Sequence, residues 1–156
     1  MKADVAGVTK IPLFPYYTRF IGLILVLLGL ISGFLYFFAG KPSFFNAKVF
    51  AVVTAYLKTR YLVIIKTNLL DEIAAVFMVA GLAFIAFSKE KTEKETYDLI
   101  RLKSLLYAVY CSVILWISIF LLVYGYLIFV AAILVYISFF IIYITIFNYF
   151  IRIKNK

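Results

Sequence analysis

The stretch FIGLILVLLGLISGFLYFF, residues 20–38, decides the fold because it runs for nineteen residues without a charge. A helix of about 20 apolar residues, rising about 1.5 Å per residue, crosses the hydrocarbon layer of a bilayer, which is about 30 Å thick. Three further apolar stretches follow at residues 69–87, 105–123 and 127–150. The sequence therefore predicts an all-α membrane protein with four transmembrane helices.

The composition supports this class. The 156 residues are 67% hydrophobic and 15% charged, which is more apolar surface than a soluble domain of this size could bury. We expect residues 1–156 to form a single integral membrane domain. The first apolar stretch is too long for a cleavable signal peptide, so we expect it to remain as an anchor.

The distribution of Lys and Arg predicts the orientation. Eleven of these residues lie in the N-terminal arm, the second connection and the C-terminal tail, whereas five lie in the first connection and none in the third. The positive-inside rule then places both termini in the cytoplasm, with the chain in the inner or plasma membrane. The net charge of +9 favours contact with anionic lipid headgroups, and we expect no nucleic acid partner.

Small residues mark one face of the first apolar stretch. Gly22, Gly29 and Gly33 recur at spacings of seven and four, and in lipid such residues let two helix backbones approach closely. We expect them to pack against another helix of the same chain, for which Ala74 and Gly81 offer matching small residues. Dimerisation through the same face is the alternative.

The first connection, KVFAVVTAYLKTRYLVIIKT at residues 48–67, alternates with a period of two. Its basic residues all fall on even positions, and its odd positions are mostly apolar, which is typical of strands. We predict a small extracytoplasmic β-hairpin, with strands at about 48–57 and 60–66. The alternative for residues 44–66 is an irregular interfacial helix. An isolated hairpin is marginally stable, so its apolar face must rest on helices, bilayer or a partner.

Acidic residues open the second apolar stretch. Asn68 can cap the helix, and Asp71 and Glu72 then lie in its first turn, where the helix dipole favours carboxylates. Ionisable groups within a membrane also mark ion or proton paths. Because these two acids lie at the start of the helix and not in the middle of the membrane, a structural role in compensating the helix dipole is favoured. A functional role in an ion or proton path stays open.

The long polar stretch is FSKEKTEKETYDLIRLKS at residues 87–104. Thr92 followed three residues later by Glu95 fits a capping box, so we expect the third helix to begin near Thr92. Within that helix, Leu99 and Leu102 should supply the inner face. Arg101 should then lie at the lipid boundary.

This stretch also holds most of the remaining acidic groups. Lys–Glu pairs four residues apart would support a helix wherever it persists. We keep Glu93, Glu95 and Arg101 as polar positions with a functional or structural role. A solvated tip between two helices is the favoured interpretation, and a docking site for a protein partner is the alternative.

The third connection is short and the last stretch is aromatic. Gly125 can adopt the left-handed conformation that ends a helix, so the third and fourth helices should form a tight antiparallel hairpin. Aromatic residues recur every seven positions along the fourth stretch, at Phe129, Tyr136, Tyr143 and Phe150. Core packing or a lipid-facing surface explains them, and a groove for a lipid or quinone is the alternative.

The segment DEIAAVFMVAGLAFIAFSKEKTEKETYDLIRLKSLLYAVY, residues 71–110, resembles an uncharacterised family of small four-helix bacterial membrane proteins. In that family an Asp-Glu pair opens a helix, and a cytoplasmic FSKEK-x-E-x-E loop leads to an Arg and a Ser before the next span. The matching positions are Asp71, Glu72, residues 87–91, Glu93, Glu95, Arg101 and Ser104. The resemblance covers the middle third of the chain, implies the four-span layout and implies no activity.

The residue types argue against catalysis. The chain has no His, a single Cys (Cys111) and acids only near helix ends, so neither a metal site nor a thiol–imidazole pair is expected, and no cofactor is implied. No charge pair lies within an apolar stretch to form an ion path. The sequence favours a binding, regulatory or structural membrane component. The alternative is a small-molecule or lipid carrier that works as a homo-oligomer.

Overall fold

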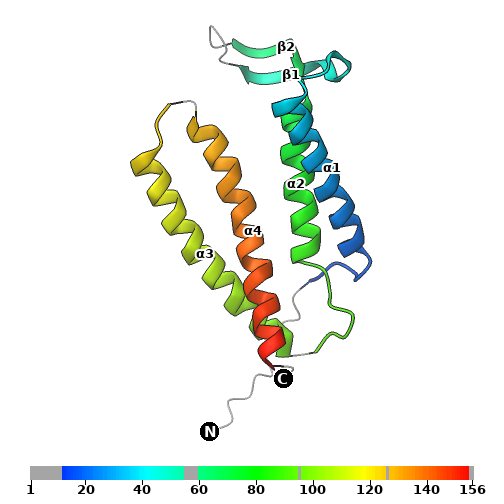
Figure 1. Cartoon of the computed structure of the whole chain (residues 1–156), viewed down its shortest axis with the longest axis vertical. Coiled ribbons are helices and arrows are strands. Elements are labelled where there is room, and N and C mark those ends of the chain that lie inside the picture. Colours follow the sequence, from blue (N-terminus) through cyan, green and yellow to red (C-terminus); the bar gives the residue numbers. More distant parts are fainter. Residues whose placement is uncertain (1–11, 55–59, 95, 126, 155–156) are drawn as a thin grey trace. The chain divides into compact units, whose positions relative to one another are not determined.

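The computed structural model describes residues 12–54, 60–94, 96–125 and 127–154, which are mostly helical (Figure 1). The helices are α1 (Thr18–Phe38), α2 (Leu70–Ala86), α3 (Thr96–Leu122) and α4 (Leu127–Lys154). Between α1 and α2 lie a short 3₁₀ turn, Ser43–Phe45, and the strands β1 (Asn46–Thr54) and β2 (Arg60–Asn68). The predicted helical architecture with one small β-hairpin is therefore confirmed in outline.

In the part of the chain that the structure describes, three helices are long and apolar enough to cross a membrane: α1, α3 and residues Val130–Lys154 of α4. The second helix, α2, is not among them. Its 17 residues rise only about 25 Å, less than the hydrocarbon thickness of about 30 Å. The prediction of a fourth span at residues 69–87 is therefore not confirmed.

Both ends of α2 are shortened by hydrogen bonds to other segments. The N–H of Leu69 donates to the carbonyl of Phe45 at 3.1 Å, which keeps Leu69 in the loop that precedes the helix. At the other end, the carbonyl of Phe87 accepts a hydrogen bond from the N–H of Phe14 at 3.0 Å. Apolar composition alone could not reveal these competing partners.

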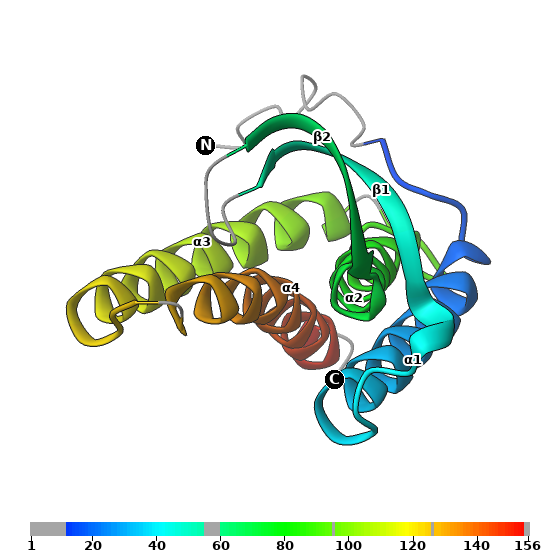
Figure 2. The same ribbon diagram turned by 90° about the horizontal axis from the view of Figure 1, so that it is seen from above.

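The chain divides into two compact units, Met1–Ile24 with Val79–Lys156, and Leu25–Met78. In the first unit, α3 and α4 form an antiparallel hairpin, and Figures 1 and 2 both show them side by side. The turn between them contains Gly125 with a φ of +72°, as predicted for a tight connection. A residue with a Cβ atom would be strained in this conformation.

The core of the first unit forms where one face of α3 meets one face of α4. The buried positions recur at helical spacing; on α3 they are Tyr97, Arg101, Ser104 and Ala108, and on α4 they are Val135, Phe140, Tyr143 and Phe147. The rings of Tyr143 and Phe147 stack at 6.1 Å. Core packing is therefore confirmed for Tyr143, whereas Tyr136 is 54% exposed and the side chain of Phe129 lies outside the described residues.

The predicted inner face at the start of α3 is wrong. Leu99 and Leu102 are each 52% exposed, whereas Arg101 is only 3% exposed and lies on the same face as Tyr97 and Ser104. The helix is rotated relative to the apolar pattern because the buried Arg101 guanidinium has an ion-pair partner, Glu93 of the preceding loop. An apolar pattern cannot anticipate a buried charge.

The glycines of α1 pack against α2, as predicted for contacts within one chain. In the first unit, a Cβ atom on Gly22 would lie 2.6 Å from the carbonyl oxygen of Gly81. In the second unit, a Cβ on Gly29 would lie 2.8 Å from the side chain of Met78. These contacts show that α1 and α2 are antiparallel and that their backbones are close together.

The second unit contains the predicted β-hairpin. The strands β1 and β2 pair antiparallel, with Lys48 opposite Lys66 and Phe50 opposite Ile64. The alternative of an interfacial helix is therefore wrong for the described residues, and positions 55–57 of the predicted first strand lie outside them. The odd positions of the strands are half-buried between residues 47 and 51, whereas the even positions are exposed. The two-residue period predicted this difference between the faces.

Candidate functional site

The tip, which we define as residues 87–94, joins α2 to α3 in the first unit. Its first residues pair with the segment before α1: Phe14 donates its N–H to the carbonyl of Phe87, and Lys89 donates its N–H to the carbonyl of Phe14 at 2.9 Å. The Phe14 ring also meets the Phe84 ring edge to face, with centroids 5.3 Å apart. The tip is thus tied to the entrance of α1 by backbone bonds.

Glu90 strengthens this connection from the tip to α1. Nη1 of Arg19 donates to both carboxylate oxygens of Glu90, at 2.7 and 2.8 Å. The two side chains are 30% and 23% exposed, so water partly screens the pair. Nothing local in the sequence indicated this pair, because 71 positions separate its members.

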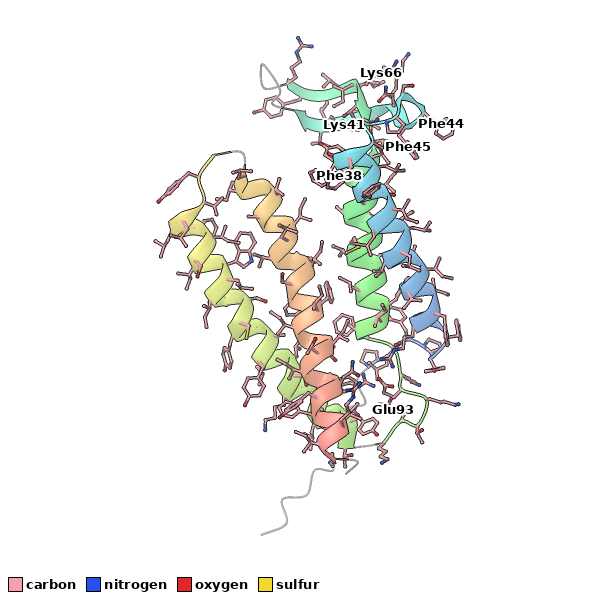
Figure 3. The ribbon with its side chains drawn as sticks, viewed as in Figure 1. Phe38, Lys41, Phe44, Phe45, Lys66 and Glu93 are labelled. Carbon is pink, nitrogen blue, oxygen red and sulfur yellow. The ribbon has the colours of Figure 1, made fainter. Side chains whose placement is uncertain are left out.

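Glu93 forms an ion pair with Arg101, the most buried charged side chain among the described residues of the first unit. Nη2 of Arg101 donates to both oxygens of Glu93 at 2.9 and 3.0 Å, and the guanidinium lies 4.5 Å from the centre of the Phe147 ring. The same carboxylate accepts the backbone N–H of Glu90 at 2.8 Å. Figure 3 labels Glu93 in the loop below α2. A buried guanidinium is tolerated only with such partners, because its desolvation is costly.

A small cavity of about 70 Å³ adjoins Arg101. It is lined by Leu13, Phe87, Arg101, Leu102, Leu105 and Tyr143. Nε of Arg101 and Oγ of Ser104 are buried without a hydrogen-bond partner among the described residues. At about 30 Å³ per water molecule, the cavity has room for roughly two waters, which suits solvation of a guanidinium better than binding of an organic substrate.

The predicted start of α3 is wrong. Thr92 lies in a turn, and α3 begins at Thr96, where Tyr97 donates its N–H to the carbonyl of Lys94 at 2.8 Å. Glu93 is drawn to Arg101 and to the N–H of Glu90, which holds the preceding residues in a non-helical loop. Glu95, the other half of the predicted capping box, lies outside the described residues.

The acidic pair at the start of α2 belongs to the second unit. Asp71 and Glu72 lie in the first turn of the helix, as predicted. Oδ1 of Asn68 accepts the N–H of Leu70 at 3.2 Å, and Nδ2 of Asn68 donates to the carbonyl of Pro42 at 3.1 Å. Burial raises the pKa of Glu72 above its ordinary value, and a hydrogen bond that the protonated Glu72 donates to the neighbouring Asp71 carboxylate adds to the shift.

Three polar side chains within the long helices form hydrogen bonds to their own helix. The hydroxyls of Ser118, Ser138 and Thr145 each donate to the carbonyl four residues earlier, at 2.7 to 2.9 Å. Cys111 is a free, exposed thiol. No group of three potential metal ligands occurs in the part of the chain that the structure describes. The charged residues of the tip are therefore the strongest candidates for a functional site.

Comparison with protein-family models, curated proteins and solved structures gave no match. The resemblance of residues 71–110 to a four-helix bacterial family therefore stays a prediction. Of the positions that the sequence singled out, the structure brings Glu93 and Arg101 together, and it assigns Asp71 and Glu72 to the other unit. Arg19 and Glu90 are the residues that sequence reasoning missed.

Proposed function

We propose that this chain is an integral membrane protein that acts as a binding, regulatory or structural component, and that its tip holds helices together. The observation that carries the proposal is the ion pair of Glu93 with the buried Arg101. This pair links the tip to α3, and Arg19 with Glu90 links the tip to α1. Carboxylates fixed in this way stabilise the contacts of the tip with α1 and α3. They do not point into a cavity large enough for an organic substrate.

The proposed topology has both termini and the tip on the cytoplasmic side of the inner or plasma membrane. In this proposal the chain crosses the membrane four times: besides α1, α3 and α4, the shorter α2 runs antiparallel beside α1 and returns the chain to the side where α1 began. The hydrogen bonds of Phe14 with Phe87 and Lys89 support this return. The excess of Lys and Arg in the two termini and the second connection supports the assignment of that side to the cytoplasm.

Lipids, a second copy of the chain or a protein partner at the tip are the proposed partners. In α1 and in α3, only 11% of the most apolar 18-residue stretch is buried. Most of the surface of these two helices must therefore contact lipid or another chain. The same exposed faces favour the alternative of a carrier that works as a homo-oligomer. No nucleic acid or cofactor enters the proposal.

Two experiments test the proposed function. Purified protein in vesicles should release entrapped ions and small organic anions no faster than protein-free vesicles do. Release that increases with the amount of protein would favour the carrier. For the topology, reporter fusions at Lys156 and after Lys94 should report the cytoplasm, and a fusion at Lys58 should report the other side. A cytoplasmic signal at Lys58 would contradict the orientation.

A further inference from the structure

A second cavity, which we call the α3–α4 groove, lies in the first unit where α3 begins and α4 ends. It encloses about 240 Å³ and is lined by Thr96, Leu99, Ile100, Lys103, Phe150 and Lys154. Its lining combines two cations with three large apolar side chains. Such a surface fits a ligand that is anionic at one end and apolar at the other.

Among the described residues, no carboxylate forms an ion pair with a lysine of the groove. The ion pairs among the described residues, Arg19 with Glu90 and Arg101 with Glu93, involve neither groove lysine. Nζ of Lys103 lies 5.2 Å from the centre of the Phe150 ring, so this ammonium is held at the wall of the groove. Asp98 lies in the first turn of α3, as the groove residue Thr96 does, but it does not line the groove.

The two lysines also lie at the depth of lipid headgroups when the helices span a membrane. The rise from Lys103 to the last residue of α3, Leu122, is about 30 Å, which matches the hydrocarbon thickness. Lys154 is the last residue of the candidate span in α4. The ring of Phe150, which lies beside Lys103, is then level with the outermost acyl carbons, and Leu99 lies about one turn outside Lys103, among the headgroups.

We propose that the α3–α4 groove binds an anionic phospholipid, with the phosphate between Lys103 and Lys154. Ammonium groups bind phosphate as compact point charges. The Phe150 ring, beside Lys103, contacts the glycerol and the first acyl carbons, and this apolar contact favours a lipid over free phosphate. The inference rests on the membrane function proposed above and names its ligand class.

The test measures retention of lipid on the full chain in detergent by native mass spectrometry. Phosphatidylglycerol should stay bound where phosphatidylcholine does not. Each lysine near a headgroup contributes about fivefold, so the double variant Lys103→Gln/Lys154→Gln should lose about tenfold or more in retention. The matched control, Lys89→Gln/Lys91→Gln, removes the same charge from tip positions that do not line the groove, and should change retention by less than about twofold because those side chains do not contact the bound phosphate.

A second variant separates charge from folding. Lys103→Arg/Lys154→Arg keeps both charges and should retain the phospholipid. Equal loss in the glutamine variant and in the tip control would overturn the groove assignment. Displacement by glycerol phosphate at the same concentration as the lipid would overturn the choice of a lipid. Solute release from vesicles would contradict the proposed function but would leave lipid retention in the groove intact, so the two failures are distinguishable.

Discussion

The tip and the β-hairpin are the two polar segments that flank α2, and they use charge in opposite ways. In the tip, Glu90 and Glu93 are each paired with an arginine. In the hairpin, Lys48 lies directly opposite Lys66, and neither forms an ion pair with a described residue. Figure 3 labels Lys66 on strand β2. Like charges placed opposite each other destabilise a strand pair.

The difference extends to apolar side chains. The exposed face of the hairpin carries Phe50 and Ile64, which are 64% and 71% exposed, and the preceding loop carries Phe44, which is 90% exposed. In the tip, by contrast, Ser88 is buried and Phe87 packs against Phe140 and Tyr143. We infer that the tip is stabilised by side-chain interactions within its own unit, whereas the hairpin depends mainly on its backbone ladder.

The largest effect is expected at Glu93. Glu93→Gln leaves the buried Arg101 guanidinium without a counter-charge, and should lower the free energy of unfolding by about 2–3 kcal/mol, below the range for a fully buried pair because Glu93 is partly exposed. Glu90→Gln breaks the more exposed pair with Arg19 and should cost at most about 1 kcal/mol. Unfolding by SDS in detergent micelles measures both. A cost at Glu93 no larger than that of Lys66→Gln in the hairpin would remove the contrast between the two regions.

The next prediction compares how tightly α1 and α2 pack toward the tip, at Gly22, and toward the hairpin, at Gly33. Gly22→Ala places a methyl group 2.6 Å from the Gly81 carbonyl oxygen, so the backbones must move apart, and the expected cost is about 1–3 kcal/mol. Gly33 belongs to the unit of the hairpin, and a Cβ there would lie 3.9 Å from Ala74. Gly33→Ala should therefore leave thermal unfolding nearly unchanged. Equal costs at the two positions would show that packing is uniform along α1.

Local patterns predicted what depends on local chemistry. The uncharged run at residues 20–38 and the two-residue period at residues 48–66 predicted α1 and the hairpin, because burial of apolar side chains imposes the period on the sequence. The cap by Asn68 and the turn at Gly125 were predicted from residue type for the same reason. These features need only neighbours within a few positions.

The features that sequence reasoning missed depend on distant residues. The rotation of α3 that buries Arg101 is set by Glu93 and the Phe147 ring. The pair of Arg19 with Glu90 joins residues 71 positions apart, with the whole second unit between them in the sequence. The short α2 is set by backbone bonds to Phe14 and Phe45. No periodicity in the sequence encodes such partners. Some residues of the candidate site could therefore be predicted from the sequence, but not which of them contact one another.

A smaller effect should appear in the hairpin when its like charges are reversed. Lys66→Glu places a carboxylate opposite Lys48, and opposite charges across a strand pair stabilise it by roughly 0.2–1 kcal/mol. Slower amide exchange in β1 and β2 would report this gain, and Lys66→Gln should give a part of it by removing repulsion alone. Faster exchange in the Glu variant would show that the two ammonium groups jointly hold an anion.

The smallest effect is expected at Thr92, the residue that the sequence indicated as a helix cap. Because α3 begins four residues later, Thr92→Ala removes no capping hydrogen bond, and should change stability by less than about 0.5 kcal/mol. Asn68→Ala is the matched comparison at the junction of the hairpin with α2. It removes the acceptor of the Leu70 N–H and should cost about 1 kcal/mol. Amide exchange at the first turns of α2 and α3 distinguishes the two variants. Faster exchange at the start of α3 in Thr92→Ala would mean that the helix extends to Thr92, and that the tip is held by a cap as well as by its ion pairs.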